Sequence, residues 1–148
     1  LGLTMSERQI NSILNLRFPI VENYMEYRLE ASTPYLALYS SSQSVAISAR
    51  INVSKNGNKL LADATFKGQI FFDKASNALK VSNPLITKFE VLENTFPKSE
   101  ASIYSIKNTI GQHLPISVLI DFDRISNDLF KFSPSSLVIV EDGLSVEF

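Results

Sequence analysis

The chain has 148 residues, of which 45% are hydrophobic and 20% are charged, and its net charge is −1. This length predicts a single domain over residues 1–148 with a substantial core, and the near-neutral charge argues against a broad basic surface for nucleic acid. Cysteine is absent, which excludes disulfides, thiol chemistry and cysteine-based metal sites.

Residues 6–17 have the pattern of a helix. Ser6 and Gln9 are spaced as in a capping box, in which each side chain bonds the backbone N–H of the other residue. The apolar residues that follow on one helical face are Ile10, Ile13 and Leu14. Pro19 predicts that the helix ends near residue 18.

The chain opens without methionine, so we expect a trimmed or mature form.

Residues 22–39 alternate between apolar and polar side chains, which predicts extended strand. One face would carry Met25, Tyr27, Leu29 and Ala31. Pro34 has no backbone N–H and therefore predicts a bulge or a break in pairing. Residues 40–43 then predict a short turn.

The clearest signal is a long hairpin over residues 44–73. Asn56-Gly57 separates two alternating runs, and this dipeptide favours a two-residue turn because both positions need positive φ. Such a turn would pair Val53 with Leu60, Ile51 with Ala62, Ala49 with Ala64, Ile47 with Phe66 and Val45 with Gly68. Every pair joins apolar or small residues, as the register of a half-buried sheet requires. A strand of about 15 residues exceeds the usual length and is expected to twist and curl.

After a turn at residues 73–77, the pattern predicts a short strand at 79–81, a corner at Asn83-Pro84, and a further strand. That further strand would place Leu85, Thr87, Phe89 and Val91 on one face. All connections up to this point are too short for parallel crossovers, so they predict an antiparallel meander.

The remaining chain returns to helical spacing at residues 98–113. Its start could fall at Ser99 or Asn94. The apolar stripe is Ile103, Ile106, Ile110 and Leu114, and Pro115 would end the helix. Residues 116–121 predict a strand, residues 122–132 are ambiguous, and a final hairpin joins 136–140 to 144–148. A two-residue turn at Asp142-Gly143 would pair Ile139 with Val146 and Leu137 with Phe148.

No arrangement of residues indicates catalysis or a metal. His113 is the only histidine, and the end of a predicted helix is a favourable place for a cation. Asp121, Asp123 and Asp128 lack the glycine and terminal glutamate of a calcium-binding loop. We therefore predict no enzyme activity, no metal and no cofactor.

The apolar faces leave two interpretations open. Sheet and helices could pack fully against each other, or they could leave an elongated apolar groove for an acyl chain. On the second interpretation the ligand-facing residues, chosen by face, are Ile47, Ile51, Phe66, Ile70, Ile103, Ile106 and Ile110.

Several motifs together resemble the YceB-like bacterial lipoproteins, a family of uncharacterised function. They are Met5-Ser6-Glu7-Arg8-Gln9-Ile10-Asn11, Leu14, Phe18-Pro19, Pro34-Tyr35-Leu36, Phe72-Asp73, Leu79-Lys80-Val81, Leu114-Pro115-Ile116 and the closing run from Val140 to Phe148. Each motif is weak alone, and their order and spacing over nearly the whole chain carry the resemblance.

The resemblance implies a periplasmic lipoprotein, tethered to the membrane through a lipidated cysteine upstream of this chain. It also implies similarity to the tubular lipid-binding (TULIP) fold, in which a curved antiparallel sheet wraps a helix around lipid. We therefore expect an α+β fold with a long curved antiparallel sheet of about five or six strands, wrapped around the 98–114 helix and flanked by the 6–17 helix. The expected function is non-enzymatic binding of lipid or another apolar ligand at the bacterial cell envelope. The alternative is an envelope scaffold that binds a protein partner and has a fully packed core.

Overall fold

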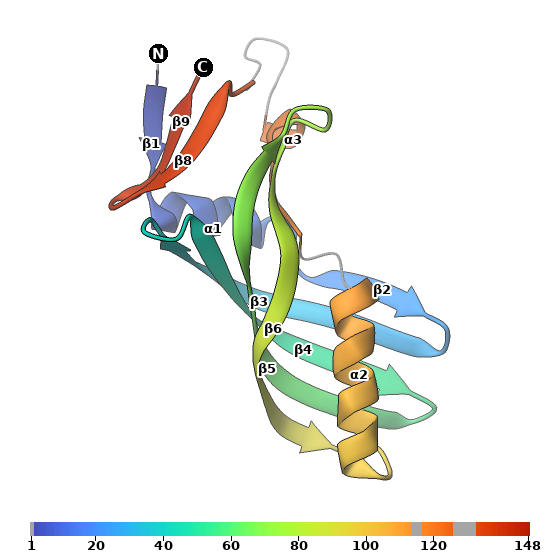
Figure 1. The fold of residues 1–148 in the computed structure, drawn as a ribbon. Coiled ribbons are helices and arrows are strands. Elements are labelled where there is room, and N and C mark those ends of the chain that lie inside the picture. The colour runs from blue at the N-terminus through green and yellow to red at the C-terminus, as the bar shows by residue number, and fades with distance from the viewer. Residues whose placement is uncertain (1, 114–116, 126–132) are drawn as a thin grey trace.

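The computed structural model describes residues 2–113, 117–125 and 133–148, and within them the chain forms two antiparallel sheets and three helices (Figure 1). The elements are β1 (Gly2–Met5), α1 (Glu7–Asn15), β2 (Ile20–Tyr24), β3 (Tyr27–Tyr39), β4 (Ser44–Lys55), β5 (Asn58–Asp73), β6 (Ala78–Asn94), α2 (Ser99–His113), β7 (Val118–Asp121), α3 (Phe122–Ile125), β8 (Ser136–Val140) and β9 (Gly143–Glu147). The larger sheet has the order β2-β3-β4-β5-β6-β7, and the smaller has the order β1-β9-β8.

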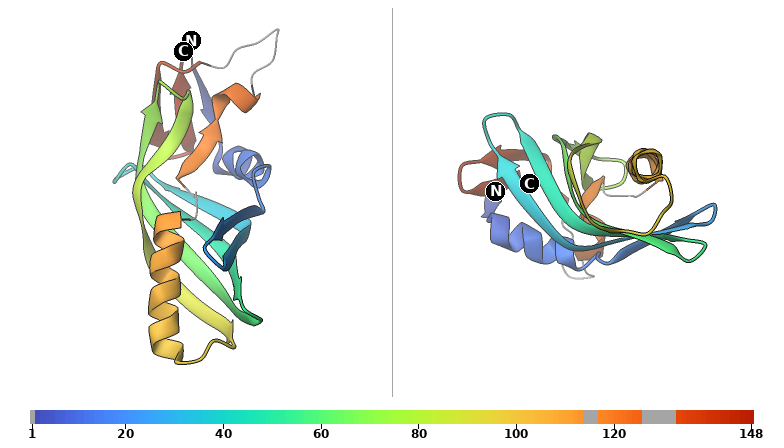
Figure 2. Two further views of the ribbon diagram at one scale, coloured as in Figure 1. Left: turned by 90° about the vertical axis from the view of Figure 1, so that its right-hand side faces the viewer. Right: turned by 90° about the horizontal axis from the view of Figure 1, so that it is seen from below.

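The predicted fold class is confirmed. Six strands follow each other as an antiparallel meander that curls strongly, and α2 lies on its concave side (Figure 2). The N-terminal helix begins after the Ser6 cap, and both reciprocal bonds of the predicted capping box form. The α2 helix starts at Ser99, one of the two predicted starts, whereas Leu114, Pro115 and Ile116 lie outside the described residues, as does the segment 126–132.

The β4–β5 hairpin matches its prediction in full. Asn56 and Gly57 adopt φ values of 51° and 80°, and Lys55 pairs with Asn58 across the two-residue turn. All five predicted cross-strand pairs form, from Val53 with Leu60 to Val45 with Gly68. Turn chemistry and hydrophobic alternation are both local properties, which is why the sequence alone determines this register.

The strand β6 differs from the prediction of two strands separated by a corner. It is continuous, and its pairing with β5 shifts register three times, each time with one extra residue on β6. One extra residue is Thr87, so Ile86 lies opposite Phe66 while Leu85 is 69% exposed. The prediction that Leu85 and Thr87 share a face with Phe89 and Val91 was therefore wrong. Bulges of this kind increase twist and bend a strand, which accounts for the strong curl of the sheet.

The segment predicted as one strand over residues 22–39 is a hairpin. It turns at Met25, which has a φ of 54° and is 83% exposed, rather than on the predicted inward face. Leu29 and Ala31 are fully buried, as expected for that face. The bulge predicted from Pro34 is confirmed, because the pairing of β3 with β4 shifts between Ser32 and Tyr35.

The smaller sheet includes β1, which the sequence did not predict, and its hairpin has a different register. The β8–β9 turn falls on residues 141–142, so Ile139 lies opposite Leu144 and Leu137 lies opposite Val146. The predicted turn at Asp142-Gly143 was wrong, because Gly143 is already the first residue of β9 and lies against the end of β1. Its φ is 149°, and a Cβ there would collide with the carbonyl oxygen of Met5. The glycine therefore allows the start of β9 to approach the end of β1 closely.

Polar side chains bond the helix α1 to the larger sheet at a place where, among the described strands, β3 is paired only with β4. The pairing of β2 with β3 ends at Ala31. Beyond it, the Asn11 carboxamide accepts from the Leu36 N–H at 2.7 Å and donates to the Leu36 carbonyl at 2.9 Å. The Glu7 carboxylate accepts from the Leu38 N–H at 3.1 Å. Helix side chains thus satisfy an edge that another strand would otherwise pair.

Candidate functional site

The structure brings the seven ligand-facing residues proposed from the sequence into one hydrophobic core. Five of them, which are Ile47, Ile51, Phe66, Ile106 and Ile110, are at most 3% exposed. Ile70 and Ile103 are partly buried and pack against the same core. Sheet residues from β4 and β5 and helix residues from α2 therefore share one apolar interior, and none of the buried side chains in the described residues is polar or charged.

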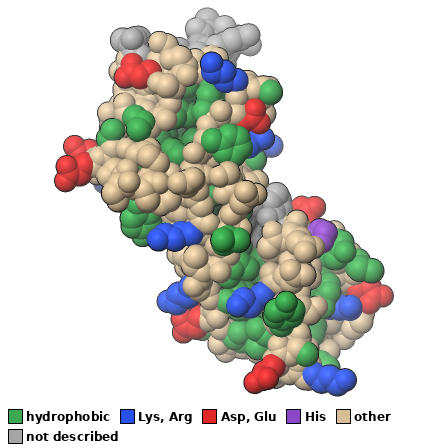
Figure 3. All heavy atoms as spheres, viewed as in Figure 1, with side chains coloured by type: hydrophobic (Ala, Val, Ile, Leu, Met, Phe, Trp, Pro, Cys, Tyr) green, Lys and Arg blue, Asp and Glu red, His purple; other side chains and the backbone are tan. Residues whose placement is uncertain are grey.

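An open groove runs between α2 and β6, beside this interior, and is called here the α2–β6 groove. Its volume is about 360 Å³. It is lined by Pro84, Leu85, Ile86, Tyr104, Lys107, Asn108, Gly111 and Gln112. Leu85 and Tyr104 are 69% and 78% exposed, so large apolar groups face solvent here. Hydrophobic and basic side chains lie next to each other on the face that carries α2 (Figure 3).

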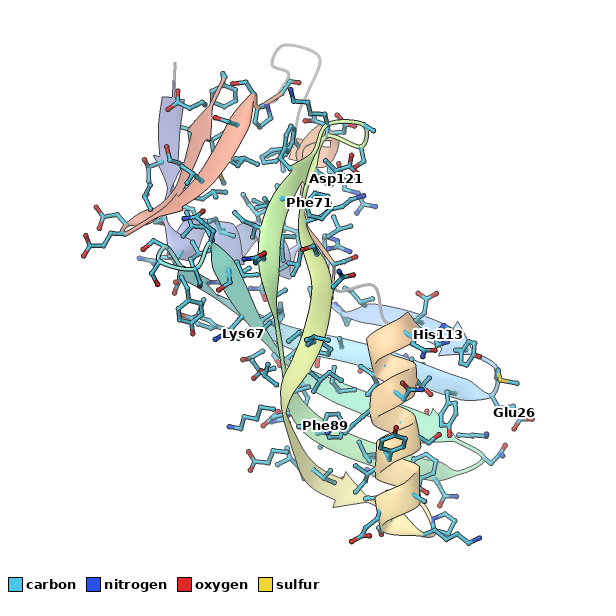
Figure 4. All side chains as sticks on the ribbon, viewed as in Figure 1. Glu26, Lys67, Phe71, Phe89, His113 and Asp121 are labelled. Carbon is cyan, nitrogen blue, oxygen red and sulfur yellow. The ribbon has the colours of Figure 1, made fainter. Side chains whose placement is uncertain are left out.

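The charge in the α2–β6 groove comes from Lys107, the one charged side chain among the described residues that line it. The Lys107 ammonium lies 5.7 Å from the centroid of the Phe89 ring on β6. Figure 4 shows the Phe89 side chain on β6 beside α2, and His113 at the other end of that helix. The His113 ring stacks on Tyr24 of β2 with centroids 3.5 Å apart. Side chains of α2 thus contact both β6 and β2, on the two sides of the concave surface.

A larger and more polar groove lies against α1. It has a volume of about 820 Å³ and is lined by Ser6, Glu7, Arg8, Asn11, Ser12, Asn15, Tyr35 and Asp142. The Tyr35 hydroxyl donates to the Glu7 carboxylate at 2.7 Å, and this hydrogen bond raises the pKa of Tyr35. Glu7 and Asn11 also bond the backbone of β3, so these polar groups hold α1 on the sheet.

A third groove lies on the other side of α1. Its volume is about 600 Å³, and it is lined by Leu3, Thr4, Met5, Gln9, Ser12, Ile13 and Ile125. These residues come from β1, α1 and α3. The seven residues proposed from the sequence line none of the three grooves, because they lie beneath the surface that the grooves cross.

The perturbed ionisable groups are dispersed ion pairs and hydrogen-bonded side chains. Lys80 and Ser76 hold the pKa of Asp73 down at about 2, with the Lys80 ammonium 2.8 Å from the carboxylate. The hydrogen bond to Asp63 raises the pKa of Arg50, and burial lowers that of Arg17, which donates to the Val118 carbonyl. Within residues 2–113, 117–125 and 133–148, no three His, Asp or Glu side chains are grouped to hold a metal ion.

Comparison with known proteins gives no match to a family model and none to a curated protein. The described helices include none that is both long enough and apolar enough to cross a membrane.

Sequence reasoning found the interior face but missed the groove beside it. One sequence pattern does indicate the α2 side of the groove, because Tyr104, Lys107 and Gly111 follow each other at helical spacing next to the isoleucine stripe. Their partners on β6 depend on the bulges of that strand, which the sequence did not reveal.

Proposed function

We propose that this protein binds lipid or another apolar ligand without catalysing a reaction, at the bacterial cell envelope. The observation that carries the proposal is a curled apolar sheet with α2 on its concave side. That helix contributes only three isoleucines to the interior, and an open groove with apolar walls runs along it. The resemblance to periplasmic lipoproteins with a TULIP-like fold supports the same function.

The binding energy would come from apolar burial. Removing apolar surface from water contributes about 25 cal/mol per Å², so an acyl chain that displaces water between α2 and the sheet gains affinity along its length. The interior is already free of buried polar side chains in the described residues, so a hydrocarbon chain would leave none of these groups without a partner. In this proposal, membrane tethering occurs through a lipidated cysteine upstream of the chain.

A second candidate function has a specific observation in its favour. Five of the seven proposed ligand-facing residues are already almost completely buried by other protein atoms. A core packed in this way suits an envelope scaffold that acts through a protein partner. The strand β6 supports this alternative, because β7 pairs with its residues Ala78 to Lys80 and, among the described strands, the rest of β6 has a neighbour on one side only.

Native mass spectrometry distinguishes the two functions. Protein expressed with its own signal sequence and purified without harsh detergent should carry co-purifying lipid, and the delipidated protein should rebind fatty acids saturably. Protein that is empty in every preparation and binds no added lipid would refute the lipid proposal and favour the scaffold.

A further inference from the structure

The position of Lys107 on α2 suggests which class of lipid the site takes. Its side chain is exposed on the helix, and of the described residues that line the α2–β6 groove it alone is charged. Among the described residues, no carboxylate lies within 4.0 Å of its ammonium, which instead lies over the Phe89 ring. The nearby Lys88 of β6, in contrast, pairs with Glu90 at 3.9 Å. The groove therefore presents one positive charge that no acidic side chain of the described residues neutralises.

The groove is lined in part by a side chain that also packs against the core. Ile86 lines the groove, lies opposite Phe66 across the β5–β6 pairing, and packs against the core. Phe89, beneath the Lys107 ammonium, also packs against the core. An elongated apolar molecule lying along Ile86 would thus rest on a side chain that is itself supported by the core, with one end near Lys107.

The size of the groove favours a single hydrocarbon chain. Its volume of about 360 Å³ is near the lower end of the range of roughly 300–1,000 Å³ for small-molecule sites. A lipid with two chains would need more room than this. The amides of Asn108 and Gln112 also line the groove, next to Lys107, and can donate further hydrogen bonds to an anionic group.

We propose that the α2–β6 groove binds a long-chain fatty acid, with its carboxylate at Lys107 and its hydrocarbon chain on Leu85, Ile86 and Tyr104. This inference rests on the proposed function and specifies its ligand class. The ammonium stabilises the carboxylate by a charge-assisted hydrogen bond, which is stronger than a bond between neutral groups. The protein therefore discriminates a fatty acid from the uncharged alcohol of equal chain length.

The test compares tetradecanoate with tetradecanol on delipidated protein, by native mass spectrometry and by competition for a bound fluorescent fatty acid. The wild-type protein should bind tetradecanoate more tightly than the alcohol. Lys107→Gln should weaken tetradecanoate binding about tenfold or more and leave the alcohol unaffected, as expected for loss of a hydrogen bond to a charged group. Lys107→Arg should retain most of the affinity.

Lys88→Gln is the matched control, because it removes one positive charge from the neighbouring strand outside the groove lining, and its affinity should equal that of the wild type. The inference about Lys107 is overturned if Lys107→Gln binds tetradecanoate as the wild type does, or if the alcohol binds equally well. In either case lipid binding itself stands. If the wild type binds neither ligand, both this inference and the proposed function fail. Both lysines are exposed, so circular dichroism should show that all variants fold.

Discussion

Replacing Asn11 by alanine tests whether α1 substitutes for a strand at the open edge of β3. The variant loses the two hydrogen bonds that the carboxamide makes to the N–H and carbonyl of Leu36, at 2.7 and 2.9 Å. Each bond contributes about 1 kcal/mol net, and leaving these half-buried backbone groups unpaired adds to the loss. The better helix propensity of alanine offsets roughly 0.5 kcal/mol. We expect the free energy of unfolding to fall by about 2 kcal/mol.

In a protein of this size a loss of that magnitude lowers the melting temperature by about 4–8 °C. Thermal unfolding followed by circular dichroism measures it. The control is Asn15→Ala, four residues along the same helix, where the exposed side chain bonds only the carbonyl of Asn11. Both substitutions introduce alanine into the same helix, and only Asn11→Ala loses contact with the sheet. Equal melting temperatures for the two variants would show that these bonds contribute nothing to stability.

Two further predictions concern a pair of glycines and the ion pair between Asp73 and Lys80. Gly68→Ala should lower the melting temperature measurably, because a Cβ there would collide with Val81, whereas Gly111→Ala on α2 meets nothing within 4 Å and should stabilise the helix by up to about 1 kcal/mol. Thermal melts of the two variants should move in opposite directions, and a stabilised Gly68→Ala would contradict the close packing described. The pKa of Asp73 is lowered to about 2 from an ordinary 3.8, so its interaction with Lys80 stabilises the fold above pH 4 and is lost as the pH falls towards 2. Asp73→Asn should therefore unfold less steeply with acid over that window, and identical acid titrations would rule out this contribution.

The elements that the sequence predicted correctly depend on local chemistry. The Ser6 capping box and the Asn56-Gly57 turn each involve residues at most three apart, so their patterns are readable without knowledge of the fold. The turn at Met25 was missed because it contains no glycine, asparagine or proline to mark it. The strand β1 was missed because it exists only through its pairing with β9 at the other end of the chain.

The candidate site shows the same division between local and tertiary information. Alternation along β4 and β5 and the stripe on α2 identified residues that do come together in one core. Periodicity assigns a face to each residue, but it does not say whether that face is covered by protein or by ligand. Lys107 was not selected, because nothing near it in the sequence shows that β6 lies beside it or that no acidic side chain pairs with it.

The irregularity of β6 links the curl of the sheet to the groove that α2 borders. At Gly68 the missing side chain lets β6 pass close to β5, and here the strand takes one of its extra residues. The next extra residue, Thr87, leaves Leu85 exposed and Ile86 turned towards the core, and both of these residues line the groove. Without the extra residue, regular alternation would place Thr87 opposite Phe66 and turn Ile86 outward, opposite Lys67. The bulge at Thr87 therefore both contributes to the bend of the sheet around α2 and places Ile86 in the apolar wall of the groove that Lys107 lines.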